Sequence, residues 1–407
     1  MHSTDTTKDI VVLIGLSDLT ELGQLAKTGN CDIVGELIQQ RDKPHPSTYL
    51  GKGKILELQG IIQATGANGI ICDDELTNTQ IKNLASQLNV KVMDRTILIL
   101  DIFASNAKSK EAIVQVEIAQ QRYNLSHLSG IGTSLSRLGG GIGTRGPGEK
   151  KLETDRRAIR SRIDDLSQEL LQIETHRKNL RKSRLKNQSN VIALVGYTNA
   201  GKSSLMNVLT QENNVVAKNR LFSTLDTTTR KSHTIHNTLI TDTVGFIQKL
   251  PTTLIKAFRS TLEELSYATI LLHVVDISSP HYTQQMQVVY ETLSVLNVSH
   301  IPIITVFNKI DETNHIDIYT KDEKATKTVA VSAKVGTNIN NLINVIEETL
   351  NNLYSTVQIF VPYNKISVLN NVYNSSKIIS EEHNESGTQL TVSIENKNIN
   401  KISEFLM

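Results

Sequence analysis

The chain has 407 residues, of which 39% are hydrophobic and 21% are charged, and its net charge is +2. This length predicts two to four domains, and this composition excludes a largely disordered chain. The small net charge does not by itself indicate a nucleic-acid-binding protein, although it is compatible with a local basic surface.

The N-terminus and the cysteines exclude further classes of protein. No apolar run reaches the roughly 18 to 20 residues needed to cross a bilayer, and the first ten residues, MHSTDTTKDI, lack the pattern of a signal peptide. We therefore expect a cytoplasmic protein without a membrane span, with a peripheral membrane-bound fraction as the alternative. Cys31 and Cys72 lack CxxC or Cys/His spacing, so we expect neither a disulfide nor a zinc site and interpret both as buried apolar residues.

Residues 1–108 alternate strand-like and helix-like patterns, which predicts an N-terminal α/β domain with a mostly parallel sheet. The strand-like runs cover 10–16, 33–38, 69–74 and 90–94, and the helical stretches cover 54–64 and 76–89. The glycines and lysines of 51–54 lack the spacing of a full phosphate loop, so we predict a plain turn before a helix there.

Residues 109–187 predict a helical hairpin, with one helix over 110–128, a second over 149–187 and a glycine-rich loop between them. Apolar residues of the second helix recur at alternating steps of four and three, the spacing of a two-helix seam, and we expect the two helices to be antiparallel. These seam residues are Ile159, Ile163, Leu166, Leu170 and Ile173. A basic cluster then leads into a polar linker, and it comprises Arg177, Lys178, Arg181, Lys182, Arg184 and Lys186.

Residues 188–354 alternate apolar strands with amphipathic helices, which predicts an α/β domain with a doubly wound, mostly parallel sheet. Residues 355–407 predict a small C-terminal α+β domain with a strand at 357–361, a helical stretch, two polar-alternating strands and a final helix. We assign no function to this last domain.

A buried-strand run at 191–195 leads directly into a G-x-x-x-x-G-K-S loop that opens a helix. Glycines let the backbone NH groups surround phosphates, and the helix N-terminus adds partial positive charge. We expect Lys202 to reach the β- and γ-phosphates as a catalytic group, and the Ser203 hydroxyl to bind Mg²⁺. The predicted phosphate loop comprises Gly196, Tyr197, Thr198, Asn199, Ala200, Gly201, Lys202 and Ser203.

Two further loops, each placed after a strand-like run, predict that the base is guanine. The carboxylate of Asp311 can accept hydrogen bonds from the ring N1 hydrogen and the exocyclic amine of guanine, and adenine lacks both donors on that edge. The first loop is the NKxD pattern Asn308, Lys309, Ile310 and Asp311, and the second is the SAK pattern Ser332, Ala333 and Lys334, expected to contact the guanine oxygen.

Between these loops lies a DxxG element formed by Asp242, Thr243, Val244 and Gly245. We expect Asp242 to hold Mg²⁺ through water and the Gly245 NH to reach the γ-phosphate. Upstream, a stretch that fits switch I comprises Phe222, Ser223, Thr224, Leu225 and Asp226. Thr224 is the expected second Mg²⁺ ligand and a catalytic residue, while the threonines at 227–229 compete for that role.

Together these motifs predict an enzyme that hydrolyses GTP with Mg²⁺. Phe246 stands where Ras-like proteins carry a water-orienting Gln, so either hydrolysis by the chain alone is slow or the phenylalanine simply packs in the switch. Asn199 resembles the asparagine that some GTPases use with K⁺, which makes K⁺ stimulation a hypothesis.

The chain also resembles the HflX family of GTPases over nearly its whole length. The resemblance rests on GGIGTRGPGEKKLETDRR at 140–157, on the segment 242–251 with its continuation to Glu264, and on FSTLD at 222–226. It departs from the family at Lys150 and Lys151, commonly Thr and Gln, at Ser223, commonly Ala, and at Thr227, commonly Pro. None of these departures touches an expected nucleotide ligand.

The resemblance implies a factor that binds the large ribosomal subunit, reaches the RNA of the peptidyl-transferase region with its hairpin, and splits or rescues stalled or idle ribosomes under stress. We expect it to be monomeric when bound. The hairpin loop carries Arg137, Arg145, Lys150 and Lys151, which can neutralise RNA phosphates, whereas the alternative for this loop is a solvated hairpin tip. The alternative function is a GTP-dependent regulatory switch that acts on a protein effector without binding ribosomes.

Overall fold

The computed structural model of the protein describes residues 8–128, 147–186, 190–211, 221–222, 227–249, 263–313, 321–365, 369–370, 372–373 and 376–407. Contacts between residues divide the chain into two compact units. The first unit comprises residues 1–176, 217–227 and 243–263, and the second comprises residues 177–216, 228–242 and 264–407. The first unit therefore includes two short segments that the sequence places within the predicted domain 188–354.

The first unit is built on a four-stranded sheet of order β2-β1-β3-β4, in which every pairing is parallel. This confirms the predicted α/β fold with its parallel sheet. The strands are β1 (Ile10–Gly15), β2 (Asp32–Ile38), β3 (Gly69–Cys72) and β4 (Lys91–Asp94). The helices between and after them are α1 (Thr20–Thr28), α2 (Lys52–Thr65), α3 (Asn78–Leu88) and α4 (Arg95–Asn106).

The side chains of β1 alternate between the two faces of this sheet, and helices cover both. Val12 and Ile14 are fully buried in one core with residues of α2 and α3. Gly51 has an extended backbone and precedes α2, which begins at Lys52, so residues 52–54 lie in the first turn of the helix and not in a turn before it as predicted. Cys72 is buried as expected, but Cys31 is only partly buried, because it lies in the connection that leads into β2, the strand at one end of the sheet order.

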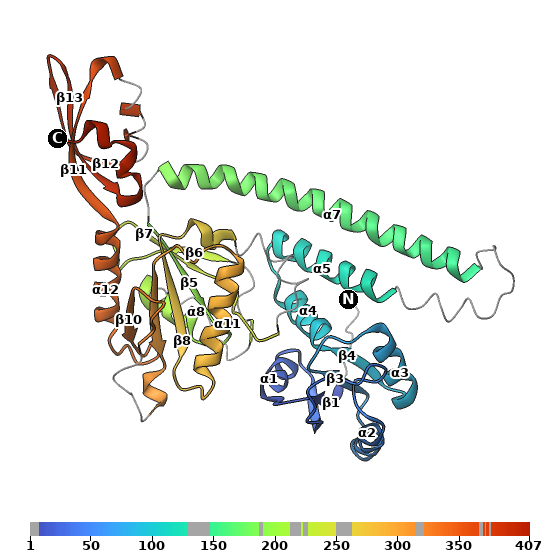
Figure 1. Ribbon diagram of the computed structural model, residues 1–407. Helices are drawn as coiled ribbons and strands as arrows, with labels where there is room; N and C mark the ends of the chain where they lie inside the picture. The colour runs from blue at the N-terminus through green and yellow to red at the C-terminus, as the bar shows by residue number, and fades with distance from the viewer. Residues whose placement is uncertain are drawn as a thin grey trace, which may run out of the picture. The chain divides into compact units, whose positions relative to one another are not determined.

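Helices α5 (Lys110–Leu128) and α7 (Pro147–Lys186) form the predicted hairpin, and Figure 1 shows α7 alongside α5. Leu166 of the predicted seam is 1% exposed and packs on Val114 and Ile118 of α5. Two ion pairs join the helices, Lys110 to Glu169 at 2.7 Å and Glu117 to Arg162 at 2.7 Å. Later residues of α5 therefore meet earlier residues of α7, so the helices are antiparallel, as predicted.

The second unit contains a six-stranded sheet of order β10-β9-β8-β5-β7-β6. All pairings are parallel except that of β6 with β7, so the predicted mostly parallel sheet carries one antiparallel edge strand. The strands are β5 (Asn190–Gly196), β6 (Thr228–Lys231), β7 (Thr238–Asp242), β8 (Ile270–Asp276), β9 (Ile303–Asn308) and β10 (Lys327–Ala330). The helices are α8 (Lys202–Thr210), α11 (Tyr282–Val295) and α12 (Ile339–Asn352).

The C-terminal part forms an antiparallel three-stranded sheet of order β11-β13-β12. Its strands are β11 (Tyr354–Pro362), β12 (Ser376–Asn384) and β13 (Gly387–Glu395). The final helix that the sequence predicts is wrong: residues 396–401 and 403–405 form two short 3-10 turns. The second turn is followed by a bridge from Leu406 to Ile359 of β11, which returns the chain to the sheet instead of letting a helix continue.

Candidate functional site

The predicted phosphate loop lies between β5 and α8 and has the strand-loop-helix arrangement that such a loop requires. Gly196 has a φ of 152°, and a Cβ at this position would lie 2.2 Å from the Val274 carbonyl oxygen. Gly201 has a φ of 93°, and its Cβ would lie 2.2 Å from the Asn308 side-chain nitrogen. Both positions therefore need glycine, because any side chain would force the loop away from its neighbours.

Lys202, the first residue of α8, is 7% exposed and turns its side chain back over the loop. Its Nζ donates hydrogen bonds to the carbonyl oxygens of Gly196 at 3.0 Å and Tyr197 at 2.7 Å. Burial lowers the pKa of Lys202 to about 8, against the opposing effect of Asp242. A phosphate beside this ammonium group would raise the pKa of Lys202 again, since a nearby anion favours the protonated state.

A pair of oxygen groups suited to Mg²⁺ lies next to the loop. The Ser203 hydroxyl donates a hydrogen bond of 2.8 Å to Oδ2 of Asp242, which is 2% exposed at the end of β7. Carboxylate and hydroxyl oxygens are hard ligands of the kind that Mg²⁺ prefers. In addition, the buried Thr198 hydroxyl has no hydrogen-bond partner among the described residues, as expected of a loop that is complete only with its ligand.

Asn308 at the end of β9 ties the phosphate loop to the predicted guanine loops. Its Nδ2 donates to the Ala200 carbonyl at 2.9 Å, and its Oδ1 accepts from the Ala333 amide at 3.0 Å. Asn308 is 3% exposed, so both hydrogen bonds are shielded from water. This side chain therefore holds three loops in register, since β5, β9 and β10 all end at the same edge of the sheet.

Asp311, the predicted guanine-reading carboxylate, is exposed and oriented by its neighbour. The Ser332 hydroxyl donates to Asp311 Oδ1 at 2.6 Å, and this hydrogen bond is the main reason that the pKa of Asp311 is lowered. The charged carboxylate is thus favoured, which is the form that accepts two hydrogen bonds from guanine. Lys334 lies nearby on the surface, 3.6 Å from Glu312.

The sequence did not predict the role of Asp276 at the end of β8. Its Oδ2 accepts from the Lys309 ammonium at 2.5 Å, and its Oδ1 accepts from the Ser278 amide at 3.0 Å. Its position in the sequence could have indicated this role, because Asp276 ends an apolar strand at the same sheet edge as Asn308. Asp276 thus fixes the ammonium group of Lys309, which belongs to the same loop as Asp311.

The remaining predicted residues divide into two groups. Ser223, Thr224, Leu225 and Asp226 lie outside the described residues, so the second predicted Mg²⁺ ligand stays a prediction. Phe222 and the DxxG residues Thr243, Val244 and Gly245 are described, are all buried, and belong to the first unit. Ile310 begins a 3-10 turn directly after Lys309.

Phe246 follows Gly245 and is 2% exposed. This burial agrees with the interpretation of its ring as switch packing. Asn199 has a φ of 62° and an exposed side chain on the phosphate loop.

Within the described residues, none of the helices combines the length and apolarity needed to cross a lipid bilayer.

Sequence models of four protein domains match the chain in order. They are described as GTP-binding GTPase N-terminal (residues 17–104), GTP-binding GTPase Middle Region (106–184), 50S ribosome-binding GTPase (191–309) and HflX C-terminal domain (317–404). The chain is 48% identical over 371 residues to GTPase HflX of Lacrimispora saccharolytica, covering 91% of this chain and 87% of the relative. It is 39% identical over 339 residues to GTPase HflX of Escherichia coli, covering 82% and 79%.

The fold is also similar to a solved structure, that of SsGBP in complex with GDP. The TM-score is 0.51 at 25% sequence identity, and the match covers 85% of this chain and 99% of that chain.

Proposed function

The chain belongs to the HflX family of GTPases, and from this premise we propose that it binds the large ribosomal subunit and splits or rescues stalled or idle ribosomes. GTP is its substrate, and hydrolysis to GDP and phosphate is its reaction. The match of residues 191–309 to a domain described as a 50S ribosome-binding GTPase is the observation that favours the large subunit as partner.

For the reaction, we propose that the phosphate loop holds the phosphates and that Lys202 neutralises charge on the β- and γ-phosphates. Ser203 and Thr224 would bind Mg²⁺ directly and Asp242 would hold it through water, and the ion when bound supplies positive charge to the phosphates. The Gly245 amide would reach the γ-phosphate. Each role is supported by the type and place of the residue, and each is testable by substitution.

Base selection is proposed to depend on Asp311, supported by Ser332 and Lys309. The Ser332 hydroxyl donates a hydrogen bond of 2.6 Å to Asp311 Oδ1 and favours the charged carboxylate. The remaining lone pairs of the Asp311 carboxylate can then accept hydrogen bonds from guanine. Substitution of Asp311 by Asn should weaken GTP binding and improve binding of xanthosine triphosphate, whose base presents an acceptor where guanine presents an amine. Unchanged preference for GTP in the Asp311→Asn variant would contradict the assignment.

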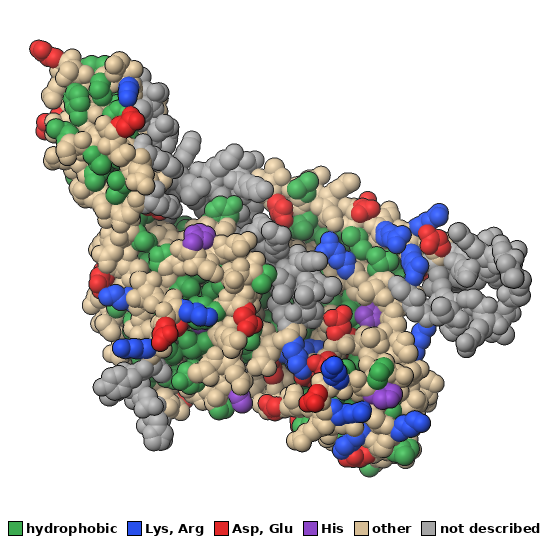
Figure 2. All heavy atoms as spheres, viewed as in Figure 1, with side chains coloured by type: hydrophobic (Ala, Val, Ile, Leu, Met, Phe, Trp, Pro, Cys, Tyr) green, Lys and Arg blue, Asp and Glu red, His purple; other side chains and the backbone are tan. Residues whose placement is uncertain are grey.

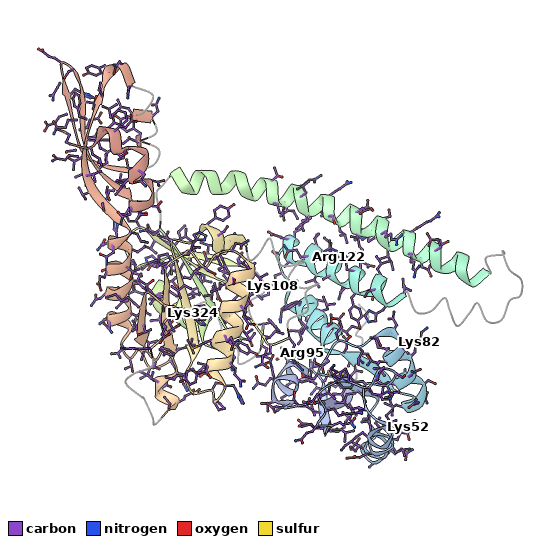
Figure 3. The ribbon with its side chains drawn as sticks, in the orientation of Figure 1. Lys52, Lys82, Arg95, Lys108, Arg122 and Lys324 are labelled. Carbon is purple, nitrogen blue, oxygen red and sulfur yellow. The ribbon has the colours of Figure 1, made fainter. Side chains whose placement is uncertain are left out.

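The hairpin supplies the proposed contact with RNA. Arg157, Arg160 and Arg162 are exposed on α7, and Arg122, labelled in Figure 3, is exposed on α5. Figure 2 shows Lys and Arg side chains gathered over the described part of this hairpin. Such side chains neutralise phosphates, and folded RNA is recognised largely through shape and charge.

Co-sedimentation with large ribosomal subunits tests this contact. With a non-hydrolysable GTP analogue bound, the chain should sediment with the subunits, and the Arg157→Ala/Arg160→Ala double variant should bind more weakly with a smaller dependence on salt. Lys327→Ala is the matched control, because it removes an exposed ion pair in the second unit. If the chain fails to sediment with large subunits whichever nucleotide is bound, the alternative is favoured, a switch that acts on a protein effector.

Two finer proposals concern the rate of hydrolysis. Because buried Phe246 offers no hydrogen bond to water, hydrolysis by the chain alone should be slow and large subunits should stimulate it. Asn199 is proposed to hold K⁺ at the phosphate loop, where the ion would add positive charge. Equal rates of hydrolysis in sodium and potassium buffers would discard the proposal for K⁺.

A further inference from the structure

Thr198 is the third residue of the phosphate loop, between the end of β5 at Gly196 and the start of α8 at Lys202 (Figure 1). It is 7% exposed, and its hydroxyl oxygen is buried without a hydrogen-bond partner among the described residues. A threonine hydroxyl offers one donor and two acceptor positions, and leaving it buried and unpaired costs free energy. The loop therefore holds a polar group whose partner none of the described residues supplies.

Other buried threonines of the second unit satisfy their hydroxyl groups within the protein. Thr210 and Thr349 donate to carbonyl oxygens one helical turn earlier, at 2.8 and 2.7 Å. Thr305 donates to Asp322 Oδ2 at 2.6 Å. Thr198 lies in a turn outside any helix, so it has no carbonyl oxygen one helical turn before it to bond. Because buried polar groups ordinarily have partners, its hydroxyl is expected to bond a ligand of the loop.

The contacts of Lys202 indicate which end of the nucleotide this part of the loop faces. Its Nζ donates to the carbonyl oxygens of Gly196 and Tyr197 at 3.0 and 2.7 Å, and a lysine at this position of a phosphate loop reaches the β- and γ-phosphates. The first two residues of the loop therefore lie beside the ammonium group for the terminal phosphates. Thr198 directly follows them in the chain, so its hydroxyl belongs to the γ-phosphate end of the loop.

Hydrolysis needs a group that orients the attacking water. Phe246 stands where Ras-like proteins carry a glutamine for this purpose, and its ring offers no hydrogen bond to water. The ammonium group of Lys202 has donors only, so it cannot accept a hydrogen bond from water. A hydroxyl group can accept one hydrogen bond and donate another at the same time, and Thr198 carries such a group on the loop itself.

We propose that the Thr198 hydroxyl orients the attacking water and is a catalytic residue for GTP hydrolysis. Its oxygen accepts a hydrogen bond from the water, and its hydrogen is donated to a γ-phosphate oxygen. The water oxygen attacks the γ-phosphorus, and the bond from that phosphorus to the bridging oxygen breaks. GDP leaves with the electron pair of that bond, and the second water proton passes to an oxygen of the released phosphate. The inference rests on the proposed position of the phosphates in the loop.

Single-turnover hydrolysis of GTP by the full chain tests the proposal, measured with the chain alone and with added large ribosomal subunits. Thr198→Val and the smaller Thr198→Ala remove the hydroxyl, whereas Thr198→Ser keeps it. Thr349→Val is the matched control, because it removes a buried hydroxyl that bonds within α12. Affinities for GDP and for a non-hydrolysable GTP analogue, measured with fluorescent nucleotides, report on the nucleotide site, and the thermal unfolding transition reports on the fold.

The valine and alanine variants should hydrolyse GTP about 100-fold more slowly, a loss typical of one positioned hydrogen-bonding group in an active site, with little change in either affinity. Thr198→Ser should keep most of the parental rate, and Thr349→Val should match the parent chain. A parental rate without the hydroxyl would overturn the proposal. An equal loss of rate in the serine variant, or a loss of affinity as large as the loss of rate, would also overturn it.

The comparison of rates also separates the role of Thr198 from the proposed ribosomal role. If large subunits neither bind nor stimulate the chain, the rates of the parent and variant chains alone still decide whether the hydroxyl acts in hydrolysis. If subunits stimulate the parent and the valine variant to the same final rate, the ribosomal role stands and the proposal for Thr198 fails.

Discussion

Replacement of Asn308 by Ala should loosen the link between the phosphate loop and the guanine loops. The substitution removes the hydrogen bonds to the Ala200 carbonyl and from the Ala333 amide, at 2.9 and 3.0 Å, in a site where Asn308 is 3% exposed. Each backbone group left buried without a partner costs about 1–3 kcal/mol, so two such groups cost about 2–6 kcal/mol unless water enters. The affinity for GTP should fall as well, because the three loops then lose their common register.

The matched comparison is Asn308→Asp, which keeps the acceptor for Ala333 but replaces the donor to Ala200 by a carboxylate oxygen. Chemical denaturation followed by circular dichroism measures the change in stability, and titration with fluorescent GTP measures the change in affinity. Both variants should lose affinity for GTP. An Asn308→Ala variant with parental stability and parental affinity would refute the reasoning, because the two hydrogen bonds would then carry no net energy.

Three other substitutions probe separate parts of the structure. Burial holds the pKa of His273 at about 4 against an ordinary 6.5, so the folded protein binds fewer protons than the unfolded chain between those values. The neutral His273 side chain therefore stabilises the fold above pH 6.5, and the free energy of unfolding falls by up to about 3 kcal/mol as the pH falls towards 4. In the His273→Asn variant, the free energy of unfolding measured by chemical denaturation should depend less on pH over this range. Gly196→Ala should abolish GTP binding, because its Cβ would meet the Val274 carbonyl at 2.2 Å, whereas Gly53→Ala has open space and should bind normally. Leu166→Ala should destabilise the hairpin by about 2–3 kcal/mol in thermal unfolding, while Leu171→Ala, 61% exposed, should change it little; equal effects would contradict the seam.

Features that the sequence predicted well are those encoded in neighbouring residues. The predicted phosphate, NKxD and SAK loops each come at or just after the end of a strand, so local spacing determines their place at one sheet edge, while their contacts with GTP stay predictions. The seam of the hairpin was also predicted from a local pattern, because the helical periodicity of α7 alone places Leu166 on the face that packs against α5.

Features that the sequence did not predict depend on contacts between distant residues. The pairing of Lys309 with Asp276 and the attachment of Lys249 to Asp73 join segments far apart in the chain, and no local pattern specifies either. The antiparallel direction of β6 and the 3-10 turns at the C-terminus likewise depend on how short segments meet a neighbouring strand. Tertiary contacts therefore determine these ion pairs, the strand direction and the turns more than local propensity does.

The most direct test of the account is GTP turnover by the purified chain alone and with added large ribosomal subunits, with Lys202→Ala as the inactive control. The account predicts slow turnover alone, a rate with subunits well above it, and no turnover from the Lys202→Ala chain under either condition. Turnover that subunits leave unchanged, from a chain that also fails to sediment with them, would contradict the proposed ribosomal role and favour a switch acting on a protein effector.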